Sequence, residues 1–197
     1  IAWADGDADT QIAEQLSADM ERAWTAFIDE NGWPAPVSSD QYLLWVLLDP
    51  TLSGTGLTTE YSSDAFPDGY PVIYVNPGYA SHAAFFGSLG THEFMHAVQY
   101  GLRDYASGAG EAWYWEASAE WAAEQARADL DTYAWSSEWY ATHPEYAYDS
   151  MQDYHQYGMF LLNAWVEEFH SDEYGMLNAW LISADLPGQP WDIVLEE

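Results

Sequence analysis

Hydrophobic and polar positions in the first half of the chain predict one helix followed by short strands. Between residues 7 and 30 apolar side chains recur at three- and four-residue spacing, as on one buried face of a helix. The apolar run 42–48 suits a buried strand, and residues 72–75 suit another strand. A short strand is also expected near 57–61, within a stretch rich in Gly, Ser and Thr. This half therefore predicts a small sheet accompanied by a helix.

Prolines on both sides of the 72–75 run suggest where that strand lies in the sheet. Pro71 precedes the run and Pro77 follows it. A proline cannot donate a ladder hydrogen bond, so it is best tolerated on a strand at the edge of a sheet. We therefore expect residues 72–75 to form an edge strand.

The second half carries helical spacing almost throughout. Helices are expected at about residues 81–100, 111–130, 153–170 and 172–184. Strands followed by helices predict an α+β fold, with a small sheet and helices in the N-terminal half and an all-helical C-terminal half. The length of 197 residues suits a single domain covering 1–197, with subdomains at about 1–101 and 102–197.

The charge of the chain is extreme. Thirty-three acidic residues face only Arg22, Arg103 and Arg127, lysine is absent, and the net charge is −30. Such a chain repels nucleic acid and anionic membrane surfaces, so neither is an expected partner. The hypothesis that follows is a protein of concentrated salt, where screening removes the self-repulsion. A melting temperature that fails to rise from low to molar salt would refute it.

Cysteine is absent, which excludes disulfides and thiolate chemistry. Any metal ligands must therefore be histidines or carboxylates. No stretch reaches the roughly 18 apolar residues of a membrane span, so a membrane is again not expected. No secretory leader is visible either. We expect an extracellular protein whose leader is not part of this chain, and the pattern does not predict its oligomeric state.

Residues 92–96 carry the most informative chemistry. They read His-Glu-Phe-Met-His and lie in a predicted helix just after the last predicted strand. Residues four apart share one helix face, so the imidazoles of His92 and His96 can reach the same metal ion. Glu93 lies next to that face, where it can take a proton from a water at the metal.

A catalytic zinc needs a third protein ligand and one open position. The strongest candidate is Glu116, twenty positions after His96, and Glu120 lies one helical turn further on. Both are surrounded by Trp and Ala, and a buried carboxylate needs a partner such as a metal. Glu116 is thus the expected ligand, while Glu120 would accept a hydrogen bond from the far nitrogen of a ligand histidine.

The pattern of residues 92–96, Glu116 and Glu120 resembles that of the gluzincin zinc metallopeptidases, the clan of thermolysin. The resemblance is carried by residues 91–121 and is distant elsewhere. It implies a zincin-like fold, a bound Zn²⁺, and peptides or proteins as substrates. In the thermolysin group the last position is Asp and contacts the first ligand histidine; here it is the longer Glu120, so its partner stays open.

The same resemblance implies roles for further residues. Glu93 would act as the general base. Several gluzincins use a Tyr from a later helix to stabilise the oxyanion, and Tyr157 is the first choice here, with Tyr154, His155 and His143 as rivals. The predicted strand 72–76 would pair with an extended peptide substrate.

Two other features have plainer alternatives. The stretch Asp5–Asp9 opens like a calcium loop, but Thr10 and Leu16 replace the expected Gly and Glu, so an acidic helix start competes with a weak calcium site. Several tryptophans near the motif line either a substrate pocket or, by their helical spacing, the core: Trp113, Trp115, Trp121, Trp135 and Trp139.

The sequence thus favours a secreted zinc peptidase. The alternatives are a non-catalytic, zinc-stabilised binding domain, in which Glu93 is incidental, and a zinc hydrolase of another amide or ester. Metal content does not separate these three functions. Zinc-dependent, chelator-sensitive cleavage of a protein or peptide substrate in high salt separates them.

Overall fold

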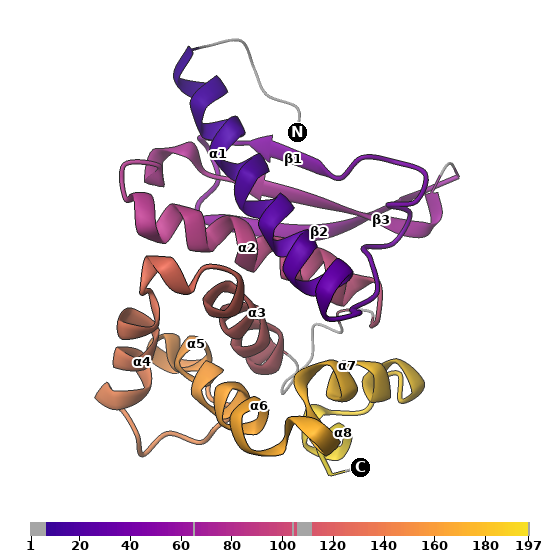
Figure 1. Ribbon diagram of the computed structural model, residues 1–197, viewed down its shortest axis with the longest axis vertical. Coiled ribbons are helices and arrows are strands. Elements are labelled where there is room, and N and C mark those ends of the chain that lie inside the picture. The colour runs from indigo at the N-terminus through magenta and orange to yellow at the C-terminus, as the bar shows by residue number, and fades with distance from the viewer. Residues whose placement is uncertain (1–6, 65, 104, 106–111, 197) are drawn as a thin grey trace.

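The computed structural model describes residues 7–64, 66–103, 105 and 112–196 (Figure 1). The side chains of the candidate calcium stretch, Asp5–Asp9, lie outside this description. The architecture is α+β, as predicted: a small sheet in the N-terminal half and helices in the remainder.

The N-terminal half contains a three-stranded mixed sheet and two long helices. Its elements are α1 (Asp7–Trp24), a π-helical turn (Thr25–Glu30), β1 (Trp45–Leu48), β2 (Gly56–Ser63), β3 (Phe66–Val75) and α2 (Ala83–Tyr100). The strand order is β1-β3-β2, with β1 parallel and β2 antiparallel to β3. The predicted strand near 57–61 is therefore confirmed, and it is longer than expected.

The expectation that residues 72–75 form an edge strand is wrong. They belong to β3, which lies between β1 and β2. Pro71 is tolerated because pairing with β1 begins only at Val72, so β3 has a single described partner strand at the proline. Among the described strands, β1 and β2 form the two edges of the sheet.

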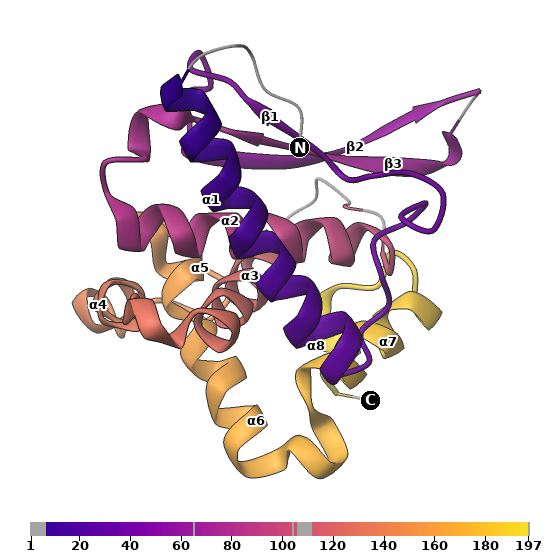
Figure 2. The same ribbon diagram turned by 45° about the horizontal axis from the view of Figure 1, so that its top comes forward.

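The helix α2 lies beneath the sheet and forms the centre of the molecule (Figure 2). All fourteen residues from Phe86 to Gln99 are buried, because α2 packs against β2 and β3 on one side and against α1 and α3 on the others. A helix that is buried on every face occupies such an interior position, and its polar side chains there, among them His92, Glu93 and His96, need partners. The candidate metal-binding motif is therefore carried by the most enclosed helix of the described chain.

The C-terminal half is helical, as expected, but its boundaries differ from the prediction. Its helices are α3 (Ala112–Ala126), α4 (Tyr133–Thr142), α5 (His155–Gly158), α6 (Phe160–Tyr174), α7 (Met176–Asp185) and α8 (Trp191–Val194). The short α4 and α8 were not predicted. The single helix expected over 153–170 is wrong, because Asp153 and Tyr154 have positive φ and the chain turns again at Met159.

Among the helices that the structure describes, none combines the length and the apolar character needed to cross a bilayer. The core that α2 and α3 share is rich in aromatic side chains. All three tryptophans of α3 are buried, as helical spacing favours: Trp115 packs against Tyr100 of α2, Trp121 against Phe27, and Trp113 against Tyr148. Full burial of one such side chain stabilises the fold by roughly 1.5–3 kcal/mol, so these rings anchor α3 in the core.

Candidate metal centre

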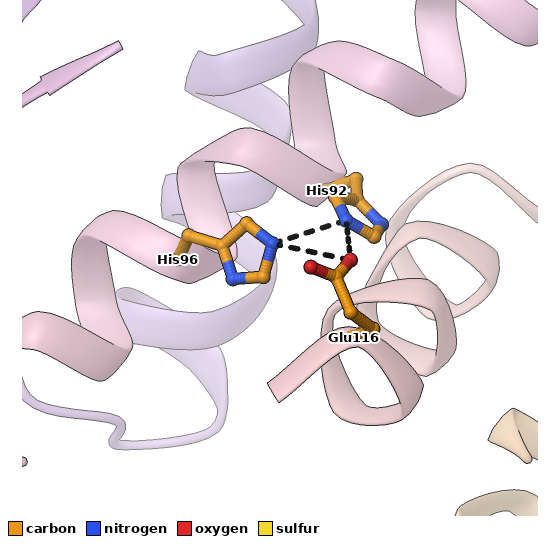
Figure 3. Close-up of side chains that lie close together, drawn as sticks. All are labelled: His92, His96 and Glu116. Atoms are coloured by element: carbon orange, nitrogen blue, oxygen red, sulfur yellow. Dashed lines mark hydrogen bonds and ion pairs between the residues drawn. The ribbon is translucent and has the colours of Figure 1, made fainter. Parts of the chain in front are cut away.

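Two adjoining helices bring three metal-binding side chains to one point. His92 and His96 project from neighbouring turns of α2, and Glu116 projects from α3 toward them (Figure 3). The Nε2 atoms of the two histidines lie 3.1 Å apart, and Glu116 Oε2 lies 3.1 Å from His92 Nε2 and 3.7 Å from His96 Nε2. The three residues expected from the sequence therefore converge.

These spacings fit a tetrahedral metal ion. Zinc bonds of about 2.0–2.1 Å to nitrogen and oxygen at tetrahedral angles separate neighbouring ligand atoms by roughly 3.3–3.4 Å. The observed separations of 3.1, 3.1 and 3.7 Å bracket that value. Two imidazoles and one carboxylate are also a donor set that zinc accepts, and three ligands leave one position open.

Each histidine has a hydrogen-bond partner at its other ring nitrogen. Nδ1 of His92 lies 3.2 Å from Glu120 Oε2. The histidine that Glu120 contacts, which the sequence did not identify, is therefore His92. Glu120 in turn accepts a hydrogen bond from the Ser136 hydroxyl on α4. Such partners fix which nitrogen carries the proton and leave Nε2 free for a metal.

The partner of His96 was missed in the sequence. Gln99 Oε1 lies 2.6 Å from His96 Nδ1, and the Gln99 amide donates to the carbonyl of Trp115 (3.2 Å) and to the hydroxyl of Ser118 (2.8 Å). This fully buried glutamine therefore connects α2 to α3 beside the ligands. Its spacing of three residues from His96, in an otherwise apolar stretch, was the available signal.

Glu93 is buried on the sheet side of the same helix. The hydroxyl of Thr58, on β2, lies 2.8 Å from Glu93 Oε2 and 2.9 Å from the Glu93 carbonyl oxygen. Gly56 makes room for the carboxylate, because a Cβ there would lie 2.3 Å from Glu93 Oε1. Neither contact could be predicted from the sequence, because no local pattern shows which residues of β2 face α2.

A pocket of about 420 Å³ opens beside these residues. Glu93, Glu116 and Tyr157 all line it, and the Tyr157 ring lies 5.9 Å from the His92 ring. Of the rivals to Tyr157, Tyr154 also lines the pocket, whereas His155 and His143 pack against Tyr146 outside it. The structure thus places Tyr157 at the candidate centre and leaves both rival histidines away from it.

A family model described as a family of unknown function (DUF6055) matches residues 6–177. The chain belongs to the DUF6055 family. No curated protein and no solved structure matches it. The matched range contains the whole candidate centre of this DUF6055 protein, from Gly56 on β2 to Tyr157 on α5.

The buried histidines and glutamates of the DUF6055 centre shift one another's pKa values. Burial disfavours the charged form of His92, but Glu116 and Glu120 outweigh it and raise the pKa of His92 to about 10. Burial opposes ionisation of Glu116 as well, yet the two histidines hold the pKa of this carboxyl far below its usual range. Glu116 and Glu120 thus favour a positive charge at His92.

Tyr157 carries a hydroxyl that stays protonated. Burial, followed by the negative charge of Glu116, raises the pKa of Tyr157 well above its usual value. A phenol in this state is a hydrogen-bond donor throughout the neutral range.

The tryptophans near the motif divide between the core and the pocket. Trp113 and Trp121 are core residues, whereas Trp115 is both buried and part of the pocket wall. Trp135 and Trp139, on α4, line the pocket, and Trp135 is 49% exposed at its mouth. The pocket interpretation therefore holds for the tryptophans of α4.

Proposed function

We propose that this DUF6055 protein is a zinc-dependent peptidase with a zincin-like, gluzincin-type centre. The observation that carries the proposal is the convergence of His92 Nε2, His96 Nε2 and Glu116 Oε2 within 3.1–3.7 Å. It is supported by the buried Glu93 on the same pocket wall and by the outer hydrogen-bond partner of each histidine.

The residues divide the chemistry between them. His92, His96 and Glu116 would hold the zinc, which when bound supplies a Lewis acid and a water of lowered pKa. Glu93, held by Thr58, takes the proton of the attacking water and passes it to the leaving amine. The hydroxyl of Tyr157 donates a hydrogen bond to the carbonyl oxygen of the substrate as that oxygen gains negative charge.

The strand that pairs with a peptide substrate has to be reassigned. The expectation that residues 72–76 play this role is wrong, because β3 has partner strands on both sides. The edge strand at the pocket is β2, whose start, from Gly56 to Thr58, forms part of the wall. An extended peptide would add along the side of β2 that faces away from β3 and pass Glu93.

The proposal is tested by cleavage of casein or a peptide library in molar salt with added zinc. We expect hydrolysis that a chelator abolishes and that zinc restores. Glu93→Gln should keep its zinc and lose nearly all hydrolysis, because only the base is removed. Glu138→Gln, the same change at an exposed position on α4, is the matched control and should leave the rate unchanged.

The outcomes separate the competing functions. Full activity of Glu93→Gln would contradict the mechanism. Zinc binding without cleavage of any peptide would favour a non-catalytic, zinc-stabilised domain. Cleavage of small esters or other amides, with peptides left intact, would favour a zinc hydrolase of another class.

A further inference from the structure

No lysine or arginine side chain lines the candidate pocket, and its two histidines, His92 and His96, are turned toward Glu116. The chain has three arginines and no lysine, and all three arginines lie within the described residues. Arg127 pairs with Asp19 and Asp129, Arg103 lies over the Trp191 ring at 5.0 Å, and Arg22 is exposed on α1. Since none of them belongs to the pocket wall, no guanidinium or ammonium group is available there to receive a carboxylate.

The described wall carries three carboxylates instead, those of Glu93, Glu116 and Glu120. Their three negative charges exceed by one the charge of a divalent ion, and the whole chain, these three included, has a net charge of −30. A carboxylate brought into this pocket meets repulsion at short range, where solvent and salt screen it least.

Each of these three carboxylates already has a partner. Glu93 accepts from Thr58, and Glu116 contacts both ligand histidines. Glu120 accepts from Ser136 and contacts His92. Every acid among the described wall residues is therefore engaged in the candidate centre, and none stands apart from it as a separate site for the ammonium group of a peptide N-terminus.

We propose that this pocket excludes carboxylates, and that the protein is an endopeptidase. It would cut internal peptide bonds in neutral or basic segments of its substrate and would not recognise a free C-terminus. This inference rests on the proposed peptidase function and narrows its substrate class. Exopeptidases hold a chain end by its charge, and the described part of the wall offers no separate group for that purpose. The pocket selects among substrates by repelling acidic segments, and unfavourable contacts with the wrong partner are a common source of specificity.

The uncharged part of the wall indicates which side chain enters. Trp135 and Trp139 on α4 face the pocket together with Tyr154, which is 63% exposed, and Phe85 on α2. Aromatic walls of this kind accept a large uncharged side chain. The preferred segment thus has an aromatic or aliphatic residue at the cleavage point and no acid nearby.

The test uses three quenched fluorescent peptides with blocked ends and one central Phe, flanked by Gln, Lys or Glu. In molar salt with zinc, the Gln and Lys peptides should show kcat/KM at least about tenfold above that of the Glu peptide. Unblocking the C-terminus should give no gain, and mass spectrometry should show internal first cuts. Equal cleavage of the Glu peptide, or stepwise loss of terminal residues, would overturn this inference while leaving the peptidase function intact. No cleavage of any peptide would overturn both.

A charge placed in the pocket should change the selection. Trp135→Arg puts a cation at the pocket mouth and should raise the Glu-to-Gln ratio of kcat/KM several-fold. Tyr133→Arg is the matched control, because Tyr133 is equally exposed on α4 but does not line the pocket. It should leave the ratio unchanged. An equal rise in both variants would show that overall charge sets the preference, and would overturn the assignment to the pocket.

Discussion

The two walls of the pocket hold the candidate centre in different ways. The sheet wall, at the start of β2, contacts Glu93 through Thr58 and Gly56. The helical wall, from α3 to α5, contributes Glu116, and its Glu120 and Ser136 form the hydrogen-bond chain behind His92. The sheet side therefore orients the proposed base, whereas the helical side completes the proposed metal site. Damage to either wall should produce a distinct failure.

The largest effect is expected from the helical wall. Glu116→Gln removes the ligand that α3 contributes and leaves a neutral amide, so zinc affinity should fall by more than the 10–100-fold that loss of an outer partner costs. Hydrolysis should disappear with the metal. Zinc titration against a chromophoric chelator measures this loss, and unchanged affinity would remove Glu116 from the site.

On the sheet wall, Gly56→Ala should lower kcat about 100-fold and leave zinc affinity nearly unchanged. The new Cβ would overlap the Glu93 carboxylate and displace it, and a displacement of about 1 Å costs rates of this order. Gly54→Ala is the control, because its Cβ would meet only Gly56 O at 3.7 Å. Zinc loss in Gly56→Ala would mean that the two walls do not act separately.

Tyr157 tests whether the helical wall also takes part in the chemistry. Tyr157→Phe removes one hydroxyl and keeps the ring beside His92, so kcat should fall by about 100-fold with zinc retained. Steady-state kinetics with a zinc assay on the same sample measures both quantities. A wild-type kcat would transfer the role to another donor, with Tyr154 as the next variant to measure.

Glu120→Gln addresses the outer hydrogen bond of the helical wall. Because the amide of Gln is a weaker partner for His92 Nδ1, zinc affinity should fall about 10–100-fold, less than in Glu116→Gln. Activity at saturating zinc should largely recover. If Glu120→Gln lost more affinity than Glu116→Gln, the assignment of ligand and outer partner would have to be exchanged.

The smallest effect is a pH dependence of the metal-free protein. The pKa of His92 is raised to about 10, so its protonation stabilises the fold fully below the usual value of 6.5, and this stability is lost as pH rises through 10. Without lysine or cysteine, few other groups titrate between pH 7 and 9. The melting temperature of the metal-free protein should fall by several degrees over this range, and bound zinc should suppress the fall. A flat profile without metal would contradict the His92–Glu116 pairing.

The sequence predicted those parts of this site that depend on local spacing. His92 and His96 share a helix face by their separation of four, and Glu116 and Glu120 lie on one face of α3 for the same reason. The α+β class followed from apolar runs that change from strand to helix spacing. Such periodic patterns involve residues close together in the chain, so a single sequence is enough to recognise them.

Contacts between distant segments were not predictable in this way. Thr58 meets Glu93 across 35 residues, and the place of β3 inside the sheet depends on parallel pairing with β1. Pro71 suggested an edge strand because proline cannot donate a ladder hydrogen bond. In the structure β1 begins to pair with β3 only at Val72, one residue after Pro71. Gln99 was visible beside His96, but its bonds to α3 required the packing of two helices.

The central claim is that both walls meet at one zinc ion. A crystal structure of the protein grown with zinc, with anomalous data collected on both sides of the zinc absorption edge, tests it directly. We predict a single strong peak about 2.0–2.2 Å from His92 Nε2, His96 Nε2 and Glu116, with Glu93 uncoordinated and still bonded to Thr58. A peak elsewhere, or none at these three residues, would contradict the account.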